Sequence, residues 1–163
     1  MATQQPWYVE QRGRSLAYIF LTNEPGIAVV EERGLDFGID YKLVLVPGDP
    51  GDNEWVGVRV KATDRDPKGM VAWDPRGLSK PYFEKIAVPI FLLVLNARDE
   101  RCFFAWIKEP VLSGEQPRLR NHTESQELPV TLIDRDGFHQ QVARCHEFFE
   151  RQKARTGNGW NHS

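Results

Sequence analysis

An acidic residue at the start of one predicted strand and a basic pair on the next could carry out chemistry on a phosphate. The first segment, DFGID, runs from Asp36 to Asp40, and the second, VRVK, ends in Lys61. Side chains alternate along a strand, so Arg59 and Lys61 share one face while the valines enter the core. Antiparallel pairing of the two strands can bring Asp40 beside Lys61. Asp40 would hold Mg²⁺ on the phosphate, and Lys61 would orient the attacking water or help to deprotonate it. Asp36 is the candidate to substitute for a second carboxylate ligand.

The elements that must position these residues are predicted from hydrophobic periodicity and turn residues. Leu16, Ile19 and Phe20 follow helical spacing, and valines alternate with other residues just after a loop rich in Gly, Pro and Asp. A continuous apolar run is typical of a strand buried on both faces. The predicted order is a helix at 10–22, strands at 27–32, 40–46 and 55–62, a loop at 63–80, a short helix at 78–85, strands at 86–95 and 101–107, a loop at 108–128, and a helix at 136–155.

This order predicts an α/β fold with a central mixed sheet flanked by helices and closed by a C-terminal helix. Phe138, Val142, Cys145 and Phe149 supply the apolar face of that last helix. We expect one domain over residues 1–155 and a disordered tail over 156–163. Pairing of segments 40–46 and 55–62 as an antiparallel hairpin is the part of this architecture on which the candidate site depends.

Composition bounds the class of protein. The chain has 163 residues and a formal net charge of −2, with 40% hydrophobic and 27% charged residues. This length suits one domain. The net charge excludes a strongly basic nucleic-acid binder but does not exclude a local basic groove. Cys102 and Cys145 lack the close partners of a zinc or redox motif, which favours free thiols and a cytoplasmic setting. No signal peptide or membrane span is predicted.

At these segments the sequence resembles the PD-(D/E)XK nuclease superfamily, and within it the Mrr-like bacterial domains of unknown function. The motif D-x-G-I-D followed by x-V-K carries the resemblance, together with the late strands VPIFLLVL (88–95) and FAWI (104–107). It extends from about Arg12 to Ile107. The resemblance implies a restriction-endonuclease-like core, with a mixed sheet and helices on either side.

Carried over residue by residue, the resemblance gives Asp40 the place of the first metal-binding acid and Lys61 that of the catalytic lysine. The second ligand, a Glu or Gln two residues before the lysine, falls on Arg59. The acid that many members carry on the first helix falls near Arg14 or Ser15, with Glu10 one turn earlier. The sequence therefore departs from the family pattern at Arg59, and at Arg14 if that is the helix position.

Such a departure has a physical consequence for metal binding. A guanidinium has no acceptor atom and is permanently charged, so Arg59 cannot ligate Mg²⁺. At ~4 Å from a divalent ion it would be repelled by several kcal/mol, even at an effective dielectric constant of about 20. An ion pair between Arg59 and Asp40 is the simpler expectation, and it would neutralise the site without metal.

The function expected from this sequence is a nuclease-like domain with an incomplete metal site. It would act as a binding component for DNA, RNA or a partner protein in bacterial defence or DNA processing, a setting that the resemblance alone implies. The alternatives are an active Mg²⁺-dependent endonuclease that cleaves DNA, and a structural interaction module without nucleic-acid contact. The sequence does not exclude a homodimer, and no membrane partner is expected.

Overall fold

The structure is a computed structural model that describes residues 6–31, 38–46, 54–72, 87–113, 116–119 and 127–160. Its elements are α1 (Trp7–Thr22), β1 (Ile27–Glu31), β2 (Tyr41–Leu45), β3 (Trp55–Thr63), β4 (Met70–Ala72), β5 (Ile90–Asn96), β6 (Cys102–Glu109), β7 (Arg118–Leu119), β8 (Glu127–Pro129), β9 (Thr131–Leu132) and α3 (Arg135–Trp160).

The strands form a mixed central sheet, as the sequence predicts. Its order is β1-β2-β3-β5-β6-β7, and β9 pairs with β6 as well. Strands β3 and β5 run parallel, whereas the other neighbours in this sheet are antiparallel. The predicted hairpin is confirmed as the β2–β3 pair, in which Tyr41 lies opposite Val58. This register sets Asp40, one residue before β2, close to the middle of β3.

Strand β5 forms the centre of the core. The apolar run predicts a strand over 86–95, and the structure begins it at Ile90, directly after Pro89, which has no N–H to donate to a sheet. All of its residues are buried, as expected for a strand covered on both faces. The strand is therefore held on one side by parallel β3 and on the other by antiparallel β6.

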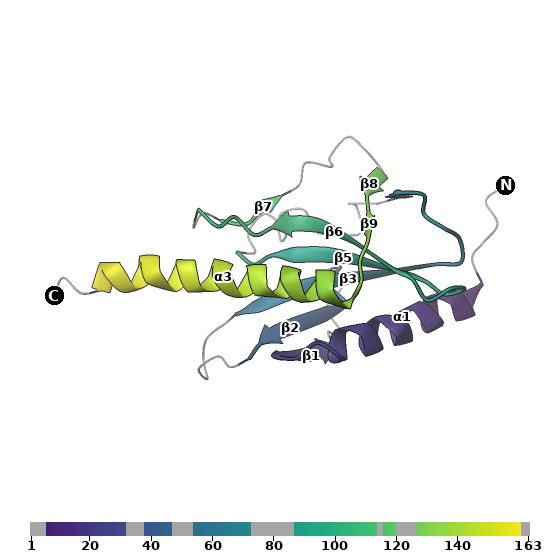
Figure 1. The fold of residues 1–163 in the computed structure, drawn as a ribbon, viewed down its shortest axis with the longest axis horizontal. Helices are drawn as coiled ribbons and strands as arrows, with labels where there is room; N and C mark the ends of the chain where they lie inside the picture. The colour runs from purple at the N-terminus through teal and green to yellow at the C-terminus, as the bar shows by residue number, and fades with distance from the viewer. Residues whose placement is uncertain are drawn as a thin grey trace.

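Helices α1 and α3 both cover the same face of the sheet (Figure 1). Gly13 of α1 meets Ala62 of β3, and Val56 lines a small hollow with residues of α3; residues 56 and 62 lie on one face because side chains alternate. The resemblance implies helices on either side, so the two described helices depart from that arrangement. The predicted short helix at 78–85 lies outside the described residues.

Helix α1 packs through small side chains that a count of large apolar residues overlooks. Gly13 and Ala17 are buried between Val9 and Leu21. Leu16 and Phe20 pack against the core, whereas Ile19, which shares their helical spacing, is 57% exposed. The face that meets the sheet is centred on Gly13 and Ala17, which allow a close approach.

Helix α3 buries the four residues that the sequence predicts, Phe138, Val142, Cys145 and Phe149. It begins one residue before the predicted start and continues to Trp160, five residues past the predicted end. Residues 161–163 of the expected tail lie outside the described residues. Both thiols are free and buried; burial raises the pKa of Cys145 to about 12 and that of Cys102 further.

The first turn of α3 is joined to the end of α1 by polar contacts. His139 Nδ1 lies 2.5 Å from the buried carboxylate of Glu24, and Arg135 donates to the Phe20 carbonyl at 2.6 Å. The Arg135 guanidinium also lies over the Phe20 ring, 4.3 Å from its centroid. These contacts fix the two helices relative to each other on the shared face.

Three short strands occur where the sequence predicts loops. β4 lies within 63–80, and β7 and β8 lie within 108–128 or at its end. β4 pairs with β8, more than fifty residues away, and β7 pairs with β6. Their pairing comes from distant segments, which local polarity and turn residues do not reveal.

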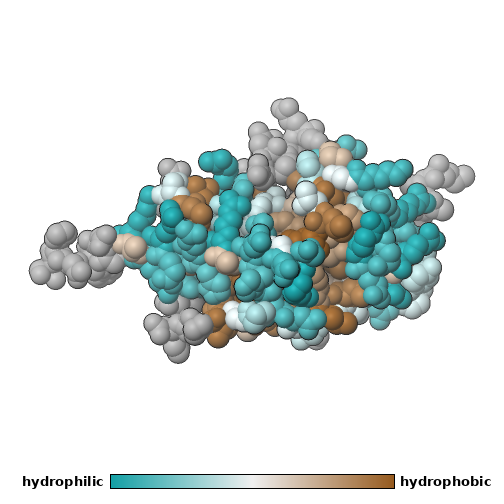
Figure 2. All heavy atoms as spheres, viewed as in Figure 1, coloured by the Kyte–Doolittle hydropathy of each residue, from teal (hydrophilic) through white to brown (hydrophobic). Residues whose placement is uncertain are grey.

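The outer sides of both helices are hydrophilic, and hydrophobic surface gathers between them in the middle of the face they cover (Figure 2). Within the described ranges, no helix is long and apolar enough to cross a lipid bilayer. Other hydrophobic areas on this face lie along its lower edge and at its upper left (Figure 2).

The close approach of α1 to β3 gives a test of this packing. A Cβ added at Gly13 would lie 2.3 Å from the Ala62 Cβ and 3.2 Å from its Cα, so we expect Gly13→Ala to lower the free energy of unfolding by about 1–3 kcal/mol despite the better helix propensity of alanine. Urea denaturation of Gly13→Ala, Ala62→Gly and the double variant measures this. The double variant should recover most of the loss; if it is no more stable than Gly13→Ala alone, the contact is not the cause.

Candidate functional site

The site is built around Asp40, at the entry to β2. Gly38 adopts a left-handed φ of +77°, which a glycine accommodates without strain, and the chain then turns into the strand. The Asp40 N–H donates to the Val58 carbonyl at 2.8 Å, so Asp40 is already held against β3. The glycine of the DFGID segment thus has a local structural role as well as a place in the motif.

Both oxygens of the Asp40 carboxylate accept hydrogen bonds. Oδ1 accepts from Arg14 Nη2 at 3.0 Å, and Oδ2 accepts from the backbone N–H of Val60 at 2.7 Å. The Asp40 side chain is 20% exposed and that of Arg14 51%. Glu10, one turn earlier on α1, lies 4.0 Å from Arg14 Nε. The cation that pairs with Asp40 therefore comes from the helix position where the resemblance implies an acid.

Burial and charge act in opposite directions on Asp40. Loss of solvent raises its pKa, whereas the Val60 N–H, the Arg14 charge and the Arg59 charge lower it, and the net direction is upward. Since desolvation is the largest effect, the carboxylate is held in a partly buried position that disfavours its charged form.

Arg59 lies near Asp40, but the ion pair described for Asp40 is the one with Arg14. Arg59 Nη1 donates to the Gly38 carbonyl at 3.1 Å. Its charge nevertheless lowers the pKa of Asp40 and that of Lys61. Arg59 thus holds the Gly38 turn and adds positive potential at the site, while Arg14 has the pairing role that the sequence assigns to Arg59.

The Lys61 ammonium is turned toward β4. Its Nζ donates to the Ala72 carbonyl at 2.5 Å. Burial, and secondarily the Arg59 charge, lower the pKa of Lys61. The structure thus brings Asp40 together with Arg14 and within the field of the Arg59 charge. The described hydrogen bond of Lys61 is instead to another strand, β4.

Metal binding at this position meets two obstacles. Each carboxylate oxygen of Asp40 keeps a second lone pair beside its described hydrogen bond, but a cation there would lie close to the Arg14 guanidinium and be repelled by its charge. Among the described residues, no three His, Cys, Asp or Glu side chains are grouped to hold a metal ion. Asp36, the predicted substitute ligand, lies outside the described residues.

A second group of polar and aromatic residues lies around Trp106 of β6. Trp106 is partly buried and packs against the core, and Gln141 and Arg144 of α3, which sequence reasoning missed, lie beside it. The spacing of Gln141 and Arg144 on the polar border of the helix is a signal, but their convergence on β6 depends on the tertiary fold. They line a hollow considered below.

Comparison with protein-family models, with curated proteins and with solved structures finds no match for this chain.

The upward pKa shift of Asp40 predicts a pH dependence of stability. The folded chain holds the Asp40 proton more tightly than the unfolded chain, so ionisation of Asp40 reduces stability as the pH rises above the ordinary value of 3.8. Relative to Asp40→Asn, the wild type should therefore lose unfolding free energy between about pH 4 and pH 7. Urea denaturation of both proteins across this range measures the difference. A wild type that gains on the variant as the pH rises would contradict the burial argument.

Proposed function

We propose that this chain is a nuclease-like domain that binds the phosphate backbone of a nucleic acid with cations at the Asp40 site and does not cleave it. The observation that carries the proposal is the Arg14–Asp40 ion pair, at 3.0 Å, where the resemblance implies two acids around a metal ion. The setting in bacterial defence or DNA processing is proposed from the resemblance alone.

The order of elements supports a nuclease-like core. A helix is followed by three antiparallel strands, and the third of them is parallel to β5 later in the chain. Asp40 enters the second strand and Lys61 lies on the third, as the motif requires. Both described helices lie on one face, so the proposal rests on the strand arrangement and the motif rather than on the helical layers.

Catalysis by a bound divalent ion does not fit the donor set. Asp40 is paired with Arg14, Glu10 lies 4.0 Å from the same guanidinium, and among the described residues no three His, Cys, Asp or Glu side chains are grouped to hold a metal ion. Arginine is always charged and offers no lone pair. A metal ion on Asp40 would have to withstand repulsion from the guanidinium groups of Arg14 and Arg59.

Phosphate binding fits the same residues. The guanidinium of Arg14 has five N–H donors and uses one described contact on Asp40, and its side chain is half exposed. Arg59 adds a second positive charge from the strand. An arginine fork suits a phosphate oxygen pair, and each phosphate contact makes affinity dependent on salt.

The proposal predicts binding without cleavage. Supercoiled plasmid and single-stranded DNA incubated with the protein and Mg²⁺ or Mn²⁺ should stay intact, while affinity for labelled DNA or RNA falls steeply with salt. Arg14→Gln should lower affinity and reduce the slope of log K against log salt by about 1. Arg118→Gln, which removes the same charge from β7 at the far side of the sheet, is the control and should leave both unchanged.

Asp40→Asn separates the proposal from a metal-dependent nuclease. Removing the negative charge beside Arg14 should raise affinity for nucleic acid, because the guanidinium no longer has an anionic partner to compete with phosphate. Filter binding at fixed salt measures this. Cleavage by the wild type that disappears in Asp40→Asn would instead establish the nuclease, and the absence of both cleavage and binding would leave a structural module.

A further inference from the structure

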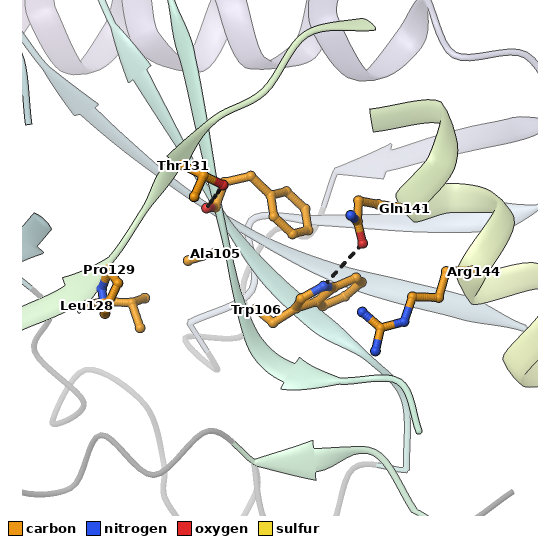
Figure 3. Close-up of a pocket in the computed structure, with 8 residues that line it drawn as sticks. Ala105, Trp106, Leu128, Pro129, Thr131, Gln141 and Arg144 are labelled. Carbon is orange, nitrogen blue, oxygen red and sulfur yellow. Dashed lines mark hydrogen bonds between the residues drawn. The ribbon is translucent and has the colours of Figure 1, made fainter. Parts of the chain in front are cut away.

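A hollow of about 360 Å³ opens at the outer edge of β6, away from the Asp40 site. Trp106 forms its floor, Leu128, Pro129 and Thr131 one side, and Gln141 and Arg144 of α3 the other (Figure 3). This volume is within the range of about 300–1,000 Å³ typical of small-molecule sites. Four separate elements, β6, β8, β9 and α3, thus supply an aromatic surface and polar groups to one concave region.

The hollow occupies an interruption in the strand ladder. β9 pairs with β6 at Phe103 and Phe104, and β7 pairs with β6 at Lys108 and Glu109. Between these two pairings, the described strands leave the stretch around Trp106 without a neighbour on that edge. The hollow opens along this stretch, so it follows from the arrangement of β6, β7 and β9 and not from a single mobile side chain.

Hydrogen bonds fix the polarity of the α3 side. An indole N–H can only donate, so the bond of 3.3 Å from Trp106 Nε1 to Gln141 Oε1 determines which way the Gln141 amide faces. Its Nε2 group is then a donor. Arg144 is also purely a donor; its Nη2 is held by Glu109 Oε1 and the Pro110 carbonyl, each at 3.1 Å, and its Cζ lies 5.9 Å from the Trp106 ring centroid.

From this geometry we propose that the hollow binds a planar heterocyclic ring that carries a carbonyl oxygen, with an oxo-nucleobase as the ligand class. The ring stacks on Trp106 against the apolar Leu128–Pro129 side, and its carbonyl accepts from Gln141 Nε2 or Arg144. A purely apolar ligand would leave these donors without acceptors when it displaces water. The base comes either from a free nucleoside or from an unpaired position in a strand. This site does not depend on phosphate binding at Asp40.

Inosine and adenosine are matched probes: position 6 carries a carbonyl acceptor in inosine and an amino donor in adenosine, and N1 correspondingly changes from an N–H donor to an acceptor. By isothermal titration calorimetry, inosine should bind the wild type at least about fivefold more tightly than adenosine. Gln141→Glu keeps the oxygen that accepts from Trp106 but replaces the Nε2 donor with a second carboxylate oxygen. It should therefore weaken inosine binding at least about tenfold. Gln140→Glu, with the same charge change on the exposed side of α3, should leave binding unchanged.

The source of the base is decided by competition. A short single strand with one hypoxanthine base that displaces inosine identifies a strand as the source, whereas inosine binding unaffected by the strand identifies a free nucleoside. Near-ultraviolet circular dichroism of both glutamate variants verifies that Trp106 keeps its environment. The proposal is overturned if neither probe binds, if adenosine equals inosine, or if the folded Gln141→Glu variant binds inosine as the wild type does.

Discussion

The contact between Gly13 of α1 and Ala62 of β3 determines where the first helix lies on the sheet. A helix this close to a strand requires a residue without a side chain, because even a methyl group at Gly13 would overlap Ala62. Arg14 follows directly, so its guanidinium reaches the carboxylate of Asp40 at 3.0 Å. The Arg14–Asp40 ion pair thus depends on the packing of Gly13, the residue before Arg14, against Ala62.

The same position explains why Asp40 is held so firmly and yet is poorly suited to metal. Its backbone N–H continues the β2–β3 ladder, and its side chain accepts the Val60 N–H, which lies just beyond the part of β3 that pairs with β2. The carboxylate therefore completes a hydrogen-bond pattern that a strand would otherwise provide. Arg14 then offsets part of the cost of burying this charge. One oxygen of the Asp40 carboxylate is thus bonded to the β3 backbone, and the other is paired with the Arg14 guanidinium.

Much of the sheet could be predicted from the sequence because its signals are local. Alternating valines and a turn-rich loop gave the β2–β3 hairpin, and the apolar run gave β5. Gly13 and Ala17 carry no comparable signal, so the spacing of Leu16, Ile19 and Phe20 predicts the helix but not the face that packs on the sheet. The strands β4, β7 and β8 form through distant partners. At the site, Asp40 and Arg59 can be found by spacing. The path of α1 is needed to show that Arg14 supplies the pairing cation, and the position of β4 to show that Lys61 reaches that strand.

The central claim is that Arg14 occupies the place of a metal ion at Asp40. Electron paramagnetic resonance of Mn²⁺ tests it directly, since the six-line signal of free Mn²⁺ is lost when the ion binds protein. With the wild-type chain added in excess at low millimolar Mn²⁺, we expect an unchanged free-ion signal. A signal that falls with the wild type and returns with Asp40→Asn would contradict it.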